Sequence, residues 1–146
     1  MKTLILVISM LAMPVIAANT NKSTDVISNL RPTISKVAKE NGIDPVLMEA
    51  IMRHESGHGS SYSARNRNNL AGIMGRRGQR VYASKEACVE HLGSILAKYK
   101  ARGRVTTAQI GKIYCKPTGK WVRNVNSQMK NIRSGRHGDI SVYTKK

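Results

Sequence analysis

Acidic and aromatic residues are scarce in this sequence. The 146 residues include 8 Asp or Glu against 25 Lys or Arg, which gives a formal net charge of +17, and the chain has no phenylalanine. A charge of this size favours a polyanionic partner such as nucleic acid, anionic lipid or an acidic wall polymer. Low aromatic content argues against the base stacking by which single-stranded nucleic acid is bound, and no nucleic-acid-binding motif is present. The composition therefore favours a polyanion other than nucleic acid.

Long apolar runs are also lacking. The apolar run at residues 4–11 follows the basic Lys2 and is too short to span a bilayer. Small residues at Ala17 and Ala18 offer a cleavage site, so residues 1–18 are predicted to be a signal peptide. No cysteine lies next to that site to carry a lipid anchor. The sequence therefore predicts a secreted or periplasmic bacterial protein without stable membrane insertion.

Cysteine occurs only twice, at Cys88 and Cys115. In an oxidising compartment an even number of cysteines favours one disulfide. That bond would close a loop of about 27 residues and stabilise the fold by about 3 kcal/mol. Two buried free thiols are the alternative. We therefore predict a Cys88–Cys115 disulfide.

Apolar spacing and turn residues divide the chain into short helices and one possible hairpin. The predicted helices cover residues 34–41, 44–56, 84–102, 106–114 and 121–132. Residues 73–82 favour a very short β-hairpin. Residues 19–32 form a polar lead-in, and the basic, aperiodic residues 133–146 are predicted to be a flexible tail. The chain is thus expected to hold one mainly α domain at residues 33–132, with at most one short β-hairpin.

Glu55 falls in the last turn of one predicted helix, which Asp44 can cap and Gly57 ends. Leu47, Ile51 and Glu55 follow at intervals of four, so they share one helix face. An apolar face and the negative end of the helix dipole both predict a raised pKa for this carboxyl group. A carboxyl group that stays protonated near neutral pH can act as a general acid. A solvated glutamate without a catalytic role is the alternative.

The segment from His54 to His58 also fits the zinc-protease pattern H-E-x-x-H. In that pattern two histidines on one helix face bind zinc, and Glu55 would be the general base. Gly57 and Gly59 argue against a helix that continues through His58. A zinc peptidase therefore stays an alternative, beside the plainer interpretation of both histidines as surface residues.

A longer string around Glu55 resembles the catalytic segment of enzymes that cleave peptidoglycan. It is most similar to the bacterial peptidoglycan glucosaminidase family that includes the flagellar muralytic protein, within the lysozyme-like superfamily. The residues that carry the similarity are Ala50, Ile51, Glu55, Ser56, Gly57, Gly59 and Ser61. Later motifs of the family are matched in the same order by Asn68-Asn69-Leu70-Ala71-Gly72-Ile73, Tyr82-Ala83-Ser84, Tyr114 and Trp121. The resemblance implies a small lysozyme-like α fold that cleaves the β-1,4 glycan backbone of peptidoglycan, without a cofactor.

The resemblance also implies roles for single residues. Glu55 would protonate the glycosidic oxygen, and Tyr114 would place its hydroxyl beside the cleaved bond. Substrate contacts are implied for Ser61, Asn68, Asn69, Tyr82 and Trp121. The plainer alternatives are an Asx turn at Asn68 and core packing for Tyr82 and Trp121.

One departure from the family leaves the mechanism open. Many members carry a second carboxylate in a longer hairpin, whereas this chain has no Asp or Glu between Ser56 and Lys85. Ordinary glycoside hydrolysis uses two carboxylates. An endo-N-acetylglucosaminidase-like hydrolase is therefore expected, with a lytic transglycosylase or muramidase that uses a single glutamate as the alternative. A non-catalytic cationic wall-binding domain is a third possibility. In each case peptidoglycan glycan strands are the expected partner, and carboxylates of the stem peptides would attract the positive charge.

Overall fold

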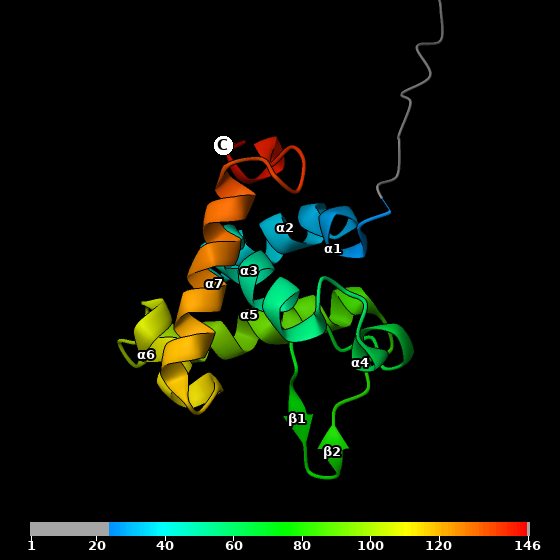
Figure 1. The fold of residues 1–146 in the computed structure, drawn as a ribbon, viewed down its shortest axis with the longest axis vertical. Helices are drawn as coiled ribbons and strands as arrows, with labels where there is room; N and C mark the ends of the chain where they lie inside the picture. Colours follow the sequence, from blue (N-terminus) through cyan, green and yellow to red (C-terminus); the bar gives the residue numbers. More distant parts are fainter. Residues whose placement is uncertain (1–23, 146) are drawn as a thin grey trace, which may run out of the picture.

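The computed structural model describes residues 24–145, so the predicted signal peptide lies outside the described residues. The described chain is a mainly α domain with one short antiparallel hairpin, which confirms the predicted fold class (Figure 1). Its helices are α1 (Val26–Asn29), α2 (Arg31–Asn41), α3 (Pro45–Ser56), α4 (Tyr62–Asn66), α5 (Lys85–Ala101), α6 (Thr107–Tyr114) and α7 (Thr118–Arg133), followed by the 3-10 helix η1 (Ser141–Tyr143). The hairpin consists of β1 (Met74–Gly75) and β2 (Gly78–Gln79).

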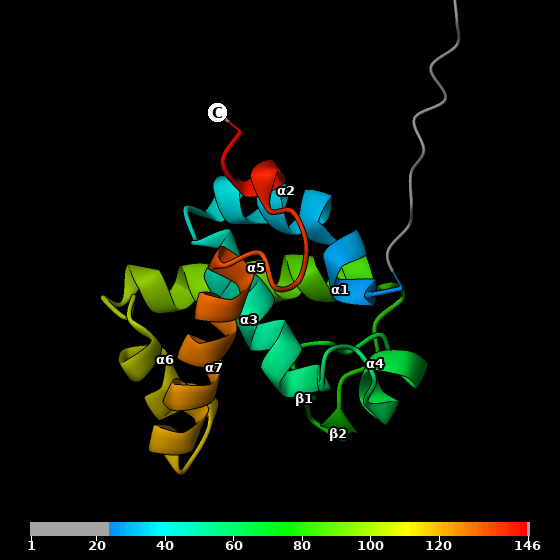
Figure 2. The ribbon, with the colours of Figure 1, turned by 45° about the horizontal axis from the view of Figure 1, so that its top comes forward.

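Helix α3 lies in the middle of the domain. Nine of its twelve residues are buried, among them Met48, Ile51 and Met52. Helix α7 packs along one side of α3, while α2 lies against both α3 and α5 (Figures 1 and 2). A helix that is apolar around most of its surface is stable only inside a core. The burial of α3 therefore fixes the place of Glu55, which lies in its last turn.

Helix starts and ends follow the capping residues of the sequence. The Asp44 side chain accepts a hydrogen bond from the Val46 amide, and Ser84 caps α5 in the same way. Thr106 and Gln109 form the expected capping box of α6. Gly57 ends α3 with a left-handed φ of 54°, a conformation that costs glycine little. Short-range hydrogen bonds thus explain why these boundaries could be predicted.

The lead-in at residues 19–32 is more ordered than predicted from Thr24 onward. Asp25 caps α1 by accepting hydrogen bonds from the Ile27 and Ser28 amides. Ile27 is fully buried, and Leu30 is nearly so. The capping aspartate and this apolar spacing are ordinary helix-start features, although the helix is only one turn long.

The C-terminal segment also differs from the predicted flexible tail. Its backbone accepts hydrogen bonds from two side chains of α2, with Ser35 Oγ bonded to the Val142 oxygen (3.0 Å) and Arg31 Nη1 to the Asp139 oxygen (2.9 Å). The Tyr143 hydroxyl donates to Glu49 Oε2 on α3 at 2.6 Å. These partners are distant in the sequence, so an aperiodic basic segment gives no local sign of them. The segment packs as part of the domain.

The two cysteines are free thiols, so the predicted Cys88–Cys115 disulfide is not formed. Cys88 is fully buried in α5, where burial raises the pKa of its thiol despite hydrogen bonds from the backbone of Leu70 and Ala71. Cys115 lies half-buried at the end of α6. The sulfur of Cys88 is therefore engaged with the loop before the hairpin, a tertiary contact that an even cysteine count does not reveal.

No helix among the described residues has the length and apolar character needed to cross a bilayer.

Candidate active site

Glu55 is half-buried in the last turn of α3, and its two carboxyl oxygens have different neighbours. Oε1 accepts a hydrogen bond from the indole Nε1 of Trp121 at 2.7 Å. On the other side, a Cβ atom added to Gly72 would lie only 2.8 Å from Oε2. Gly72 also has a left-handed φ of 65°, which favours glycine. The site thus holds one oxygen by a hydrogen bond and keeps space at the other by the absence of a side chain.

Trp121 supports Glu55 from the first turn of α7. The residue is only 2% exposed, and its ring lies against Tyr114 with the centroids 5.4 Å apart. The ring of His54 meets it edge-on at 6.4 Å. A buried indole N–H needs an acceptor, and Glu55 provides it. Trp121 is therefore both a core residue, as the plainer alternative held, and a direct partner of the carboxylate.

Tyr114 lies beside the same site at the end of α6. Its hydroxyl donates a hydrogen bond to the Ala71 carbonyl, directly before Gly72 in the chain. Burial, and then the charge of Glu55, hold the pKa of this phenol well above its ordinary value. Tyr114 therefore stays neutral, and its oxygen retains lone pairs that can accept a hydrogen bond.

A hollow of about 300 Å³ opens next to Gly72 between the hairpin, α5 and α6. No charged residue lines it, and its walls are Gly72, Ile73, Met74, Ile95, Tyr99, Ile113 and Tyr114. Apolar and aromatic walls of this kind suit the faces of sugar rings, which stack on such surfaces.

The two asparagines of the next motif serve the backbone. Asn69 is 1% exposed, and its Nδ2 donates to the carbonyls of Ile73 (2.8 Å) and Arg80 (2.9 Å). Its Oδ1 accepts from the Ile73 amide at 3.0 Å. Both amide hydrogens are thus used within the hairpin, and the predicted sugar contact of Asn69 stays a prediction. Asn69 ties together the two sides of the hairpin and so positions the loop that contains Gly72.

Asn68 binds the segment that leads into α5 through its side chain, and no Asx-turn hydrogen bond is found for it in the described structure. It has a positive φ of 52°, its Nδ2 donates to the Tyr82 carbonyl at 3.1 Å, and its Oδ1 accepts from Lys85 Nζ at 3.1 Å. Its amide group therefore holds the chain between the hairpin and α5. The predicted sugar contact of Asn68 stays a prediction.

Ser61 and Tyr82 also have structural partners. The Ser61 hydroxyl caps α4 by accepting a hydrogen bond from the Ala64 amide. The Tyr82 hydroxyl is bonded to His91 Nδ1 on α5 at 2.7 Å, and burial raises the pKa of Tyr82 to about 12. These contacts stabilise α4 and the chain between the hairpin and α5. The predicted substrate contacts of Ser61 and Tyr82 stay predictions.

The H-E-x-x-H interpretation loses its geometric basis. Helix α3 ends at Ser56, and His58 follows with a left-handed φ of 58°, so the two histidines do not share a helix face. His54 packs against Trp121, whereas the ring of His58 lies 5.4 Å from that of His137. Within residues 24–145 no cluster of three or more His, Cys, Asp or Glu side chains has the arrangement of a metal site.

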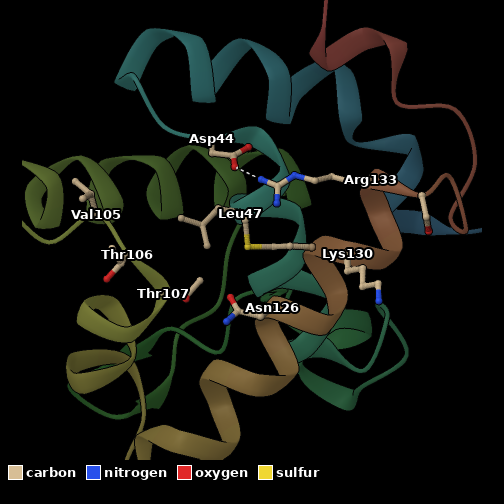
Figure 3. Close-up of a pocket in the computed structure, with 10 residues that line it drawn as sticks. Asp44, Leu47, Val105, Thr106, Thr107, Asn126, Lys130 and Arg133 are labelled. Carbon is tan, nitrogen blue, oxygen red and sulfur yellow. Dashed lines mark hydrogen bonds and ion pairs between the residues drawn. The ribbon is translucent and has the colours of Figure 1, made fainter.

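A larger hollow, of about 730 Å³, lies at the opposite end of α3 (Figure 3). Its rim carries the ion pair between Asp44 and Arg133 (2.9 Å), with Leu47 in the floor and α6 and α7 as walls. Asp44 and Glu55 are separated by about 16 Å along the helix axis. The carboxylate at this hollow is already paired and exposed, so size alone does not mark the catalytic site.

A glycoside hydrolase needs a carboxyl group near a hollow for the sugar chain, and Glu55 lies against Gly72, which forms part of the wall of the 300 Å³ hollow. Comparison with protein families agrees with this class of enzyme. Residues 31–134 match the Glucosaminidase family, described as mannosyl-glycoprotein endo-beta-N-acetylglucosaminidase. The chain belongs to this family and is a glycoside hydrolase acting on peptidoglycan. Neither a curated protein nor a solved structure matches the chain significantly.

Two features of the site were missed by the sequence analysis. The motif that ends in Gly72-Ile73 was recognised, but the contact of Gly72 with Glu55 was not, because a glycine gives no sign of which side chain it admits. The hydrogen bond from Trp121 to Glu55 joins residues 66 positions apart. The one sequence feature that pointed to this hydrogen bond was a single tryptophan at the start of an apolar helix face, since a buried indole N–H needs an acceptor.

Proposed function

We propose that the protein is an endo-acting N-acetylglucosaminidase that cleaves the β-1,4 glycan backbone of peptidoglycan with Glu55 as general acid. The hydrogen bond between Trp121 and Glu55 is the observation that carries the proposal. An indole N–H can only donate, so Oε1 must accept, and the acidic proton of a neutral carboxyl group is left on Oε2. Oε2 is the oxygen beside Gly72 and its hollow. The proton would therefore lie on the oxygen next to Gly72, one of the residues that line the hollow.

The reaction then proceeds in two proton transfers. Glu55 protonates the glycosidic oxygen as the bond to the anomeric carbon breaks, and the resulting carboxylate keeps the Trp121 hydrogen bond, which is stronger to a charged acceptor. Glu55 next removes a proton from the incoming water or hydroxyl group. Tyr114 holds the Ala71 carbonyl and so keeps Gly72 in place during both steps.

The positive charge that develops at the anomeric carbon needs a nucleophile, but no carboxylate of the described residues lines the hollow, and Glu55 adjoins it only through Gly72. Glu49 and Asp25 are bound to arginines elsewhere in the fold, and Glu86 and Glu90 lie exposed on α5. The acetamido oxygen of the substrate can attack instead and form a cyclic intermediate, which water then opens. Attack by a sugar hydroxyl would make the enzyme a lytic transglycosylase, which is the second candidate.

Mass spectrometry of fragments released from purified peptidoglycan tests these routes. Reducing GlcNAc ends are expected from the proposed enzyme. Reducing MurNAc ends would instead identify a muramidase, and anhydro-MurNAc ends a lytic transglycosylase. Absence of all three products from a protein that binds the wall would favour the non-catalytic wall-binding alternative.

We also propose that the enzyme acts outside the cytoplasm, after cleavage near Ala17 or Ala18. The basic Lys2, the short apolar run and the small residues that follow it support this location. N-terminal sequencing of protein recovered from the periplasm or medium is the test. An intact N-terminus on protein confined to the cytoplasm would contradict the proposal.

A further inference from the structure

The two sides of the hairpin differ in chemistry. On the side of α5 and α6, the hollow beside Gly72 has no charged wall. On the side of α4, a depression of about 600 Å³ is lined by the arginine pocket, which we define as Arg67, Arg76, Arg77 and Arg80. Figure 1 shows α4 next to β2 on this side and α6 beyond β1 on the other. One short hairpin thus separates a neutral hollow from a strongly cationic one.

Part of the arginine pocket is held in place before any ligand binds. Arg67 donates a hydrogen bond to the Gln79 carbonyl at 3.3 Å, and its guanidinium lies over the Tyr62 ring at 5.8 Å. Arg80 lies over the Tyr82 ring at 6.0 Å. Contacts of this kind with aromatic rings orient a guanidinium but leave its N–H groups able to donate.

The two remaining arginines form the turn itself. Met74 pairs with Gln79 and Gly75 with Gly78, so Arg76 and Arg77 are the two turn residues. Both are exposed. A Cβ atom added at Gly78 would meet no atom within 4 Å, which shows open space beside the turn. The turn therefore presents two adjacent guanidinium groups next to an unfilled depression.

No carboxylate neutralises this charge. The sequence has no Asp or Glu between Ser56 and Lys85. Ion pairs in the described part of the chain use Arg31, Lys36, Arg53 and Arg133 as their cations, and none of them involves the arginine pocket. Four arginines kept close together without a counter-charge repel one another, which disfavours the arrangement unless an anion is bound.

We propose that the arginine pocket binds carboxylates of the peptidoglycan stem peptides. The inference rests on the proposed function. Arginine forms paired hydrogen bonds with carboxylates, and adjacent guanidinium groups suit peptides that carry several of them. Strand β1 begins two residues after Gly72, so Gly75 at the edge of the pocket lies at most about 10 Å along the chain from the residue next to Glu55. Stem peptides branch from the glycan at regular intervals, so a strand bound at Glu55 brings them within reach of the hairpin.

Binding to defined glycan strands tests the arginine pocket. Every protein carries Glu55→Gln so that the strands stay intact, and affinity is measured in low salt by calorimetry. One strand preparation keeps its stem peptides, and the second has lost them to an amidase. Both are first treated to remove phosphate polymers, and a third preparation retains those polymers but lacks stem peptides. The test variant is Arg76→Gln with Arg77→Gln, and the charge-matched control is Arg102→Gln with Arg136→Gln, two exposed arginines outside the hairpin.

The parent protein should bind strands with stem peptides roughly fivefold more tightly than stripped strands, as expected for two exposed arginine–carboxylate pairs. The test variant should bind both preparations equally weakly, and the control variant should keep the difference. Equal affinity of the parent for both preparations would overturn the inference, as would equal losses in the two double variants. Tight binding only to strands with phosphate polymers would assign the pocket to phosphate and also overturn it.

Cleavage is scored separately with Glu55 intact, which distinguishes this inference from the proposed function. If both strand preparations were cleaved but stem peptides did not increase the affinity, the inference about the arginine pocket would be refuted and the glucosaminidase proposal would stand. If stem peptides increased the affinity through the arginines but no strand was cleaved, the glucosaminidase proposal would be refuted and the inference about the arginine pocket would stand. Both arginines of the test variant lie in an exposed turn, and a circular dichroism spectrum equal to that of the parent verifies its fold.

Discussion

Helix α3 carries two glutamates six residues apart, and their surroundings differ in every respect. Glu49 is fully buried and accepts four hydrogen bonds, two from Arg31, one from Arg53 and one from Tyr143. Glu55 is half-buried, and the one hydrogen bond found for its carboxylate in the described structure comes from Trp121. Two glutamates on one helix therefore differ in both burial and number of hydrogen-bond donors.

The number of donors decides what each carboxylate can do. Burial alone would raise the pKa of Glu49, but hydrogen bonds from Arg31 and Tyr143 and the charge of Arg53 lower it below the ordinary value. Glu49 is thus locked in its charged form and joins α2, α3 and the C-terminal segment. For the second oxygen of Glu55, beside Gly72, no donor is found in the described structure, so this oxygen is the one available to a substrate. A single helix thus carries a structural carboxylate and the carboxylate that we propose as the general acid.

Replacing Glu55 should give the largest effect on activity. Glu55→Gln keeps the shape of the side chain but cannot deliver a proton, so the cleavage rate should fall by about 10²–10⁴-fold. Release of soluble fragments from purified peptidoglycan measures it, and thermal unfolding should be nearly unchanged. Glu90→Gln, an exposed change on α5, is the control and should cleave normally. A wild-type rate for Glu55→Gln would refute the proposed acid.

Replacing Glu49 should give the largest effect on stability. Glu49→Gln leaves Arg31 buried without its counter-charge and Arg53 with Asp25 alone, which should cost about 3–5 kcal/mol of unfolding free energy. Urea denaturation measures the loss. The matched control is Glu40→Gln, whose exposed pair with Lys36 is worth little. If both variants unfolded at the same urea concentration, the buried network would not have its assigned role.

Adding one methyl group at Gly72 separates contact with Glu55 from backbone strain. Gly72→Ala places a Cβ 2.8 Å from Glu55 Oε2, and the displaced carboxyl group should lose about tenfold in cleavage rate. Gly103→Ala has a similar left-handed φ but meets no atom within 4 Å, so it should lose about 1 kcal/mol of stability and no activity. Equal activity of the two variants would contradict the contact.

Removing one hydroxyl group tests the docking of the C-terminal segment. Tyr143→Phe deletes one of four hydrogen bonds to Glu49 and should reduce the free energy of unfolding by about 1–3 kcal/mol, with catalysis unchanged. Tyr62→Phe, at an exposed tyrosine, is the control for loss of a hydroxyl. A flexible tail would make the two variants equally stable.

The smallest effect is a change of stability with pH. Because the pKa of folded Glu49 lies below its ordinary value of 4.5, its contribution is complete above pH 4.5 and disappears as the pH falls through the folded pKa. Asp25 adds to the same trend, since Arg53 and Ser28 also lower its pKa against the effect of burial. Urea midpoints at pH 6 and pH 3 should differ less in Glu49→Gln than in the parent protein. An identical difference in both would assign the acid sensitivity to other groups.

Local features of the sequence determined the five longer helices, the hairpin and the position of Glu55 at a helix end. Asp44, Ser84 and Thr106 act on amides two or three residues away, and Gly57 ends α3 through its own backbone conformation. Interactions of this range involve residues that are close in the sequence, so apolar spacing and capping residues are enough to predict them. The resemblance around Glu55 added the catalytic class on the same local basis.

Only the tertiary structure decided which distant groups meet. Trp121 reaches Glu55, and Tyr143 reaches Glu49, because α7 and the C-terminal segment pack back onto α3. Cys88 faces the Leu70–Ala71 backbone rather than Cys115, and Asn69 binds the backbone on both sides of the hairpin. Packing of the helices buries these polar groups, and a buried polar group is stable only with a hydrogen-bond partner. Which partner lies within reach is decided only when the core has formed.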